Sequence, residues 1–302
     1  MTWVVAVLIS TTLFALVSIL DKRLVAHLFP SAQSFNVAFG LLQAPIAVLL
    51  FAVVVPTVGF DGGAGIPWAI ASGLLWAGGI TLFFHGLRLE EVSRATPIQM
   101  TAPIFTALLA VTFLGEALNA LQWTAIIVVV LGGATVTVRP ELGWFRIANR
   151  RALVILLGAS LVMGVAFVVS KEATNQMNVW AIQAFRAAAM GAGVLALQGR
   201  GRALREARRM VNDRRAMGML VLTEGFMAPV AAFMFVVALS LGPVSLVSAV
   251  SSSRPLIVLG ASALLSTPFW NVLGEPLDRR TLGIKLVSTG LIVGGVAVLA
   301  LA

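Results

Sequence analysis

Residues 152–170 read ALVILLGASLVMGVAFVVS, a run without a single charged side chain. An apolar run of about 20 residues is long enough for a helix to cross the hydrocarbon core of a bilayer. Nine further runs of this kind are spread over the chain, so we expect an all-α integral membrane protein with ten transmembrane helices. The ten windows are 3–20, 31–55, 66–86, 95–114, 120–138, 152–170, 179–198, 216–239, 244–267 and 281–301.

The composition of the chain excludes several other classes of protein. Of the 302 residues, 59% are hydrophobic and only 11% are charged, whereas soluble domains carry about 25% charged residues. High hydrophobicity also excludes disorder. The absence of cysteine excludes disulfides, and with only two histidines we expect no metal site and no cofactor.

The basic residues predict how the chain lies in the membrane. The net charge is +9, but the basic residues stand in short tracts between apolar runs, which favours membrane topology over nucleic-acid binding. All but Lys171, Arg186 and Arg254 of the 21 Lys and Arg residues fall in loops on one side. The positive-inside rule makes that side cytoplasmic in a multi-pass protein of the cell (inner) membrane, with both termini outside. The tract Arg200–Arg215 either contacts anionic lipid head groups or is a plain topology signal.

Two parts of the sequence repeat each other. Residues 87–93 read LRLEEVS and precede Pro103, while residues 239–245 read LSLGPVS and precede Pro255 at the same spacing. Each copy then reaches a Gly-Glu-x-Leu motif, at 115–118 and 274–277. The repeat predicts two units of five helices, residues 1–143 and 144–302. Because five is odd, the second unit is inverted relative to the first, and inverted repeats are typical of alternating-access transporters.

This pattern resembles the EamA-type branch of the drug/metabolite transporter superfamily. The resemblance rests on the proline of the fourth span, the Gly-Glu-x-Leu turn, the Lys that ends the first span of each half and Arg186 in the seventh span. Asn36 departs from it, because an Arg is expected at the matched place in span 2. The resemblance implies a central cavity lined by the first four helices of each half, with peripheral fifth and tenth helices. It also implies small polar substrates such as amino acids, nucleosides or their analogues, moved by exchange or with protons.

Three charged residues inside the spans are the main candidates for a substrate site. By helical rise, Glu224 and Arg254 both lie roughly 12–15 Å from a membrane face, on neighbouring antiparallel helices. Arg254 and Arg186 could bind a carboxylate or phosphate through their guanidinium groups. Glu224 could bind an amine or carry the coupled proton. The alternative is a structural Glu224–Arg254 ion pair that never meets substrate.

Uncharged residues add to this predicted site. Each of the polar side chains could instead bond a neighbouring backbone carbonyl, and Trp76 could serve packing rather than stack on a substrate. The further candidates for substrate binding are Asn36, Gln43, Gln99, Gln183 and Trp76. Pro103 and Pro255, in the matched middles of spans 4 and 9, are predicted to kink their helices, either as hinges or as fixed bends.

Two other features concern packing. Gly290 and Gly294 form a small-residue face on the last span, which permits close helix contact within the chain or in a homodimer. Glu116 and Glu275 lie in matched turns, where we expect them to complement the dipole of the span that follows each of them.

Together these features predict a secondary active transporter that moves a small polar metabolite by alternating access. The sequence has no Gly-x-x-x-x-Gly-Lys-Ser/Thr loop, so ATP is not expected to drive transport directly. His27 and His85 lie near span ends without intramembrane carboxylates beside them, which disfavours an enzyme. The alternative is a flippase for a phosphate-bearing lipid carrier, in which the two arginines would bind the head group.

Overall fold

The computed structural model describes residues 2–59, 63–89, 98–137, 150–210, 212–258 and 279–301, and these residues form helices and short connections without a strand. Six helical segments are long and apolar enough to cross a membrane: Thr2–Asp21, Ala32–Val58, Gly63–Gly86, Arg150–Thr174, Val179–Gln198 and Arg214–Leu241. Four shorter apolar helices are Ala102–Phe113, Ala120–Thr135, Val244–Val258 and Val287–Leu299. Each of the ten predicted windows thus contains a helix, and six of them have the full length of a span. The chain is a multi-pass membrane protein.

The helices fall into two sets along the chain. The first set is α1 (Thr2–Arg23), α2 (Ala32–Leu49), α3 (Val55–Val58), α4 (Ile66–Leu87), α6 (Ala102–Phe113) and α7 (Ala120–Thr137). The second set begins with α8 (Arg150–Thr174), α9 (Val179–Gln198), α10 (Gly201–Met210) and α11 (Arg214–Leu220). It continues with α12 (Ala228–Leu241), α13 (Val244–Ser251) and α15 (Arg279–Leu301).

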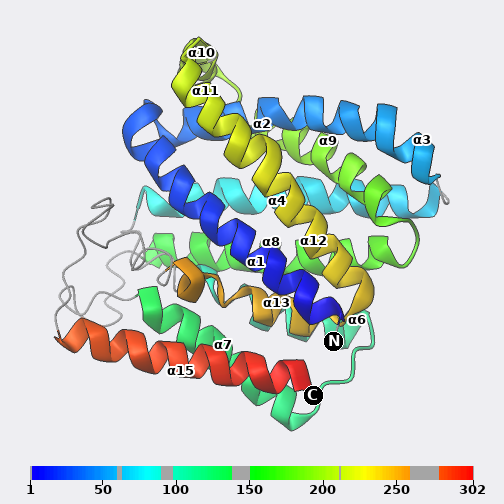
Figure 1. The fold of residues 1–302 in the computed structure, drawn as a ribbon, viewed down its shortest axis with the longest axis vertical. Helices are drawn as coiled ribbons and strands as arrows, with labels where there is room; N and C mark the ends of the chain where they lie inside the picture. The colour runs from blue at the N-terminus through cyan, green and yellow to red at the C-terminus, as the bar shows by residue number, and fades with distance from the viewer. Residues whose placement is uncertain are drawn as a thin grey trace.

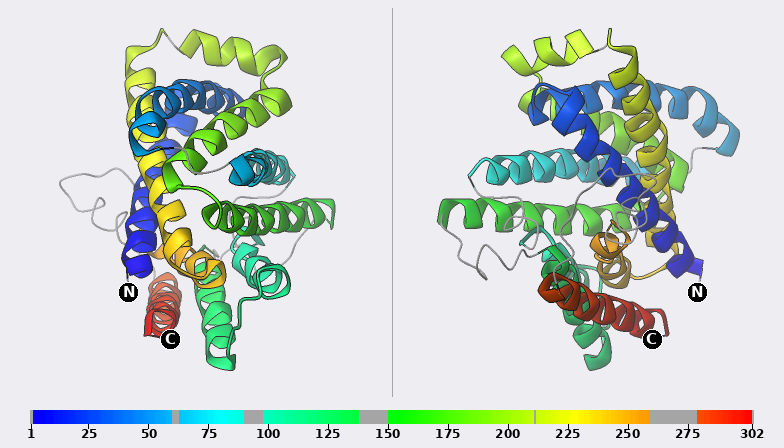
Figure 2. Two further views of the ribbon diagram at one scale, coloured as in Figure 1. Left: turned by 90° about the vertical axis from the view of Figure 1, so that its right-hand side faces the viewer. Right: turned by 60° about the vertical axis from the view of Figure 1, so that its left-hand side comes forward.

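The two sets pack against each other in matched pairs. Helix α4 packs on α8 as α12 packs on α1, and α6 contacts α8 as α13 contacts α1. The pairs α2–α9, α6–α13 and α7–α15 join equivalent helices of the two sets. This pairing is what a two-repeat architecture requires. Helices α7 and α15 lie together at one edge of the molecule (Figures 1 and 2), the peripheral position that the family resemblance implied.

Small residues bring the central helices close together. A Cβ at Gly73 of α4 would lie 2.5 Å from the Arg186 carbonyl oxygen and 2.9 Å from the Ala189 Cβ of α9. Only glycine permits this approach, because close helix contact in membranes depends on small side chains at the crossing. The crossing matters for function, since it fixes where Arg186 and the next turn of α4 lie.

Gly73→Ala should therefore destabilise the protein. The added methyl group meets backbone rather than a flexible side chain, so we expect a loss of about 1–3 kcal/mol and a lower unfolding temperature in detergent. Gly158→Ala in α8 is the matched control, because a Cβ there meets nothing within 4 Å. An equal loss of stability in both variants would contradict this account of the α4–α9 crossing.

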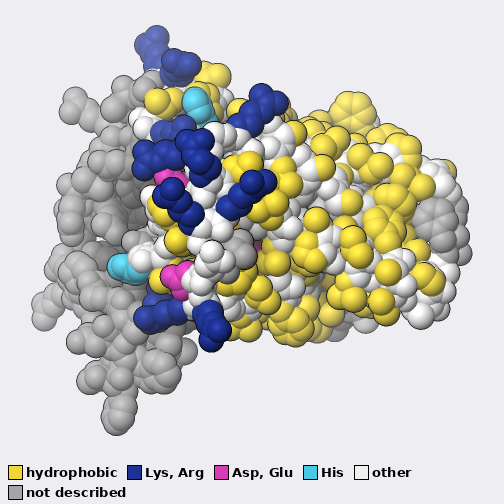
Figure 3. Space-filling model, turned by 90° about the horizontal axis from the view of Figure 1, so that it is seen from above, with side chains coloured by type: hydrophobic (Ala, Val, Ile, Leu, Met, Phe, Trp, Pro, Cys, Tyr) yellow, Lys and Arg dark blue, Asp and Glu magenta, His cyan; other side chains and the backbone are white. Residues whose placement is uncertain are grey.

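Basic side chains gather at one end of the helices. Seen from above, Lys and Arg gather on one side of the described surface, and apolar side chains are prominent on the opposite side (Figure 3). The ends of α1, α4 and α9 and the start of α8 meet at this end (Figure 1). The exposed basic residues here include Arg23, Arg88, Arg150, Arg202, Arg205, Arg208 and Arg209. The predicted grouping of basic loops is present, and its assignment to the cytoplasm remains a prediction.

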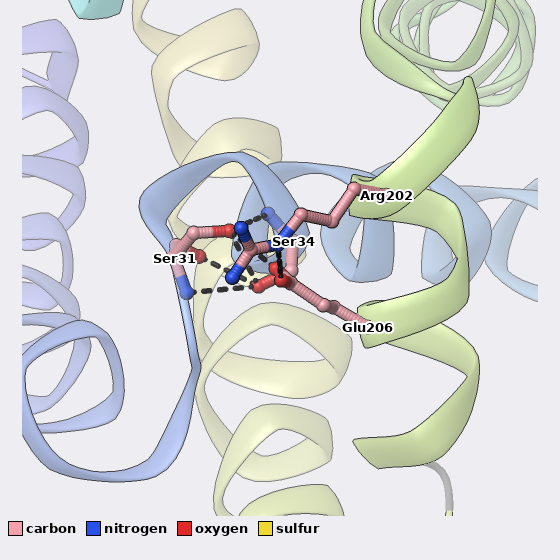
Figure 4. Close-up of polar contacts among 4 residues, drawn as sticks. All are labelled: Ser31, Ser34, Arg202 and Glu206. Atoms are coloured by element: carbon pink, nitrogen blue, oxygen red, sulfur yellow. Dashed lines mark hydrogen bonds and ion pairs between the residues drawn. The ribbon is translucent and has the colours of Figure 1, made fainter.

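Helix α10 gives part of the basic tract a defined position. Ala203 and Ala207 are buried, and the helix packs on α2. Glu206 accepts a hydrogen bond of 2.8 Å from Ser31 Oγ, in the capping box that starts α2, and another from Arg202 Nε (Figure 4). The hydrogen bond from Arg202, with that from Ser31, holds the pKa of Glu206 below its usual range.

Docking of α10 should accordingly depend on pH. Because the pKa of Glu206 is lower when α10 is docked, the ionised carboxylate stabilises the contact at pH values above the usual carboxyl pKa. That stabilisation is lost as the pH falls through the lowered pKa. The chain has no natural cysteine, so a single spin label at Arg205→Cys can report the mobility of α10. We expect a mobile spectrum at low pH and an immobile one at neutral pH. Adding Glu206→Gln should make the label mobile at neutral pH as well, and a pH-independent spectrum in the parent would contradict the prediction.

Candidate functional site

In the fourth span of each half, a short turn lies just before the proline. A turn at Met100–Thr101 precedes α6, and a turn at Ser252–Ser253 follows α13. Pro103 therefore lies in the first turn of the new helical segment, and Pro255 directly follows the first residue of its segment. Backbone hydrogen bonds three residues apart run through both turns, from Thr101 to Ile98 and from Ser253 to Val250, so the helix path is tightened locally at the predicted place. Whether the prolines are hinges or fixed bends stays a prediction. Irregular backbone is tolerated at membrane depth where protein or a cavity satisfies the freed backbone groups.

Arg254 follows directly after the second turn and reaches α1. Its Nη2 donates a hydrogen bond to Ser18 Oγ, and its guanidinium carbon lies 5.3 Å from the Phe14 ring centroid. The arginine is thereby held between a hydroxyl and an aromatic face of the first helix. A charge inside the membrane normally faces such partners or water.

Glu224 lies beside a residue that the sequence analysis did not single out. It is 6% exposed and belongs to the π-helical segment Val221–Met227, between α11 and α12. Its carboxyl group lies close to that of Asp21 at the end of α1, and both carboxyls are near enough to Arg254 to interact with its charge. Segments of π-helix are frequent at functional sites.

Glu224 and Arg254, the pair that the sequence offered as a structural alternative, interact electrostatically without forming a salt bridge. No salt bridge joins the two side chains in the described part of the chain, where the Glu224 carboxyl meets Asp21 and the Arg254 guanidinium meets Ser18. Asp21 was missed because it ends the first apolar run and reads as the start of a loop. One signal in the sequence could have pointed to Asp21. The repeat matches it to Ser170, so the end of span 1 carries an acid that the matched end of span 6 lacks.

The three residues, which we call the charged cluster, can hold an exchangeable proton. Two carboxylates are both acceptors, so the neighbouring Asp21 and Glu224 can form a hydrogen bond with each other only when one of them carries a proton. A single guanidinium then balances the remaining negative charge. Removal of the proton leaves two adjacent like charges against one positive charge, which is a strained arrangement at low dielectric.

Arg186 of α9 is the second buried charge. The residue is 3% exposed, and its guanidinium carbon lies 5.6 Å from the Trp76 ring centroid of α4. Its Nε and Nη1 atoms are buried and have no hydrogen-bond partner among the described residues. The Oε1 atom of Gln183, one turn earlier on the same helix, is buried and unpartnered as well. Trp76 itself packs edge-on against Phe167, with ring centroids 5.9 Å apart.

The other predicted polar residues serve contacts between helices or stand apart. Asn36 Nδ2 donates to Gln198 Oε1 at 3.2 Å, and Gln198 Nε2 donates to Thr81 Oγ1 at 2.8 Å, so this chain of bonds ties α2, α9 and α4 together. Gln43 is buried on α2 against Gly191 of α9. Gln99 Oε1 is buried without a partner in the described region, just before the first turn. The predicted site residues therefore lie in several separate sets of contacts and not in one.

Glu116 does not act on the span that follows it. It accepts hydrogen bonds from the Val244 backbone nitrogen at 2.6 Å, from the Ser245 backbone nitrogen at 3.2 Å and from Ser245 Oγ. The expectation that it complements the start of α7 is therefore wrong, because its carboxylate satisfies the free N–H groups of α13 in the other half. The matched Glu275 lies outside the described residues.

Glu116→Ala should lower the stability of the protein. It leaves the start of α13 without its acceptor, and hydrogen bonds to a charged group contribute about 1.5–3 kcal/mol. We expect a clear fall in the unfolding temperature in detergent. Glu172→Ala is the control, because within the described part of the chain the Glu172 carboxylate accepts hydrogen bonds from Asn175 and Gln176 alone, both close to it in sequence. An unfolding temperature unchanged by Glu116→Ala would show that the cap contributes little.

The small-residue face of the last helix packs against none of the residues that the structure describes. A Cβ at Gly290 or Gly294 of α15 would meet nothing within 4 Å, whereas one at Gly295 would lie 2.5 Å from Val129 of α7. The contact between α7 and α15 thus uses the opposite side of α15. A homodimer through Gly290 and Gly294 remains a prediction.

Comparison with known proteins identifies the family. The family model of EamA-like transporters matches residues 1–138 and 150–301, once over each set of helices. The chain belongs to the EamA-like transporter family. This EamA-like protein is accordingly a membrane transporter rather than a member of an enzyme family.

Solved structures share the fold of this EamA-like transporter. Twenty-nine chains match it significantly. One crystal structure superimposes with a TM-score of 0.71 at 15% sequence identity, over 99% of this chain and 96% of the other. At this identity the likeness concerns the fold alone. No curated protein matches the sequence significantly.

Proposed function

We propose that this EamA-like transporter moves small polar metabolites, such as amino acids, nucleosides or their analogues, by proton-coupled or exchange transport with alternating access. It would work in the cell (inner) membrane with its basic loops in the cytoplasm and both termini outside. The observation that carries the proposal is the charged cluster of Asp21, Glu224 and Arg254, which lies where the two sets of helices meet, with Glu224 buried and the other two residues partly buried.

The cluster suits coupling because its members come from both halves. Asp21 belongs to α1, whereas Glu224 and Arg254 belong to the two spans of the second half that pack on α1. A movement of one half against the other changes the distances within the cluster, and with them the affinity for its proton. A substrate that binds at the cluster changes the same balance of charge, so substrate binding and proton binding affect each other.

The turns in the fourth span of each half support the same mechanism. Discontinuous helices near the midplane are a recurring feature of transporters whose repeats move around a fixed site. The turns at Met100–Thr101 and Ser252–Ser253 replace the α-helical hydrogen bonds by bonds three residues apart at matched positions, which would let the segments on either side tilt. Pro103 and Pro255 then act as hinge residues by preventing a continuous α-helix from forming across each turn.

Glu224→Gln should separate proton coupling from binding. Glutamine keeps the shape and a hydrogen bond to Asp21 but cannot release a proton, so substrate exchange should persist while uptake driven by a pH gradient is lost. The assay is transport by the full chain in proteoliposomes, with a panel of amino acids and nucleosides, with and without a pH gradient. Asp21→Asn should likewise keep substrate exchange and lose uptake driven by a pH gradient.

The control for this experiment is Glu172→Gln, because within the described part of the chain this carboxyl accepts hydrogen bonds only from residues close to it in sequence. It should keep both activities. Unchanged response to the pH gradient in both Glu224→Gln and Asp21→Asn would reject proton coupling through the cluster. Absence of transport of every panel member by the parent protein would reject the proposed substrate range.

The alternative function is a flippase for a phosphate-bearing lipid carrier. The unpartnered guanidinium of Arg186 is the observation that favours it, since arginine binds phosphate bidentately. Translocation of a fluorescent lipid phosphate in the same proteoliposomes, with no transport of metabolites, would decide for the flippase.

A further inference from the structure

Helix α10 carries a continuous face of basic side chains. Four exposed arginines make up this face, which we call the arginine face: Arg202, Arg205, Arg208 and Arg209. At 3.6 residues per turn they fall within about one third of the helix circumference. The buried Ala203 and Ala207 lie on the opposite side, where the helix packs on α2. The arginine face is therefore turned away from α2.

The apolar side of α10 is already used inside the protein. Ala203 and Ala207 belong to a buried cluster that includes Leu24 and Phe35, and Met210 packs against the same cluster. An amphipathic helix that inserts into a membrane has to offer its apolar side to the acyl chains. Helix α10 cannot do so while it is docked, so its arginine face is the side left for a partner.

Short connections hold α10 at the ends of two membrane spans. Gly199 and Arg200 separate it from the span Val179–Gln198, and residues 211–213 separate it from the span Arg214–Leu241. Two or three residues reach at most about 11 Å, so the helix has to stay close to the bilayer surface. Figures 1 and 2 show α10 at the outer edge of the molecule, beyond α2.

The spans on either side of α10 expose apolar side chains. Leu197, at the end of α9, is 57% exposed, and Phe226, in the segment after α11, is 65% exposed. Figure 3 looks at the molecule from this edge, with basic side chains gathered on one side and apolar side chains prominent on the opposite side. Basic residues next to an apolar surface are typical of the level at which acyl chains give way to head groups.

The arginine face has little negative charge near it in the protein. Arg202–Glu206 is the one ion pair that the described residues form on α10. Arg205 lies three and four residues before Arg208 and Arg209, and like charges at this spacing repel each other on a helix. An anion beside these three arginines would relieve the repulsion.

We propose that the arginine face of α10 binds the head groups of anionic phospholipids. Guanidinium groups bind phosphate oxygens bidentately, and four or more basic residues on a helix beside a membrane span are typical of sites for anionic lipids. A plain topology signal depends on the number of positive charges and does not require that they share one face of a docked helix.

The test adds lipid to the purified full chain in detergent, where lipid reaches every face of the protein. Short-chain phosphatidylglycerol is compared with short-chain phosphatidylcholine, and binding is followed by the unfolding temperature and by native mass spectrometry. Phosphatidylglycerol should bind at least about tenfold more tightly, since each basic residue near an anionic surface strengthens binding about fivefold. Added salt should weaken its binding, because exposed charges are screened.

Three double variants locate the binding. Arg205→Gln with Arg208→Gln removes two arginines that form no ion pair among the described residues, and it should weaken phosphatidylglycerol binding at least about tenfold. Arg205→Lys with Arg208→Lys keeps the charge and should retain most of the affinity. Arg88→Gln with Arg150→Gln is the matched control, because it removes the same charge from exposed positions at the same end of the molecule, outside α10. The control should bind phosphatidylglycerol as the parent does.

Two results would overturn the proposal. One is equal binding of the two lipids by the parent, which is what a plain topology signal predicts. The other is an equal loss of phosphatidylglycerol binding in the two glutamine double variants, which would mean that positive charge anywhere at this end is enough. No readout depends on transport, so the proposed transport function can fail while the lipid site stands, and the reverse.

Discussion

A charged side chain in the hydrocarbon region has to find its partner inside the protein, and most of the internal architecture of this transporter follows from that constraint. Arg254 is held by Ser18 and Phe14 of α1, and Glu224 by Asp21 of the same helix. The end of α1 therefore supplies partners for two charges from the second half of the chain. The packing of α1 on α12 and α13 is thus as much a requirement of electrostatics as of apolar contact.

The repeat and the charges play different roles. Residues that shape the backbone are shared by both halves: a proline in each fourth span, and a Gly-Glu-x-Leu motif after each fourth span. The buried charges are not shared. Under the same alignment, Asp21 matches Ser170, Glu224 matches Ser72, Arg254 matches Ala102 and Arg186 matches Asn36. The repeated backbone supplies the capacity for symmetric movement, and the unmatched charges make one site chemically distinct from its counterpart.

The sequence predicts the fold of this protein better than the site. Long apolar runs such as 152–170 fix the helices, because a bilayer imposes both their length and their internal hydrogen bonding. Bends at Pro103 and Pro255 were expected, but the sequence does not show that a turn lies just before each proline.

Partners across the two halves were harder to predict. Asp21 and Glu116 act on residues about 200 and 130 positions away, at Glu224 and Val244. Nothing local marks either contact, because both arise from the way helices of the two halves lie side by side. The charged residues Glu224, Arg254 and Arg186 could be singled out from sequence alone, since charge is rare in apolar runs, but their partners could not.

The turn between α12 and α13 shows how such long-range contacts make a local structure possible. Only Gly242 and Pro243 separate the two helices, and a turn this short leaves the last carbonyls of one helix and the first N–H groups of the next close together inside the protein. Lys171 of α8 donates to the carbonyls of Leu239 and Gly242, at 2.6 and 3.1 Å, while Glu116 accepts from the start of α13. One cation and one anion from other helices thus complete both helix ends, each at the end whose dipole attracts it. The tight turn is stable because the rest of the fold supplies the caps that its own residues cannot.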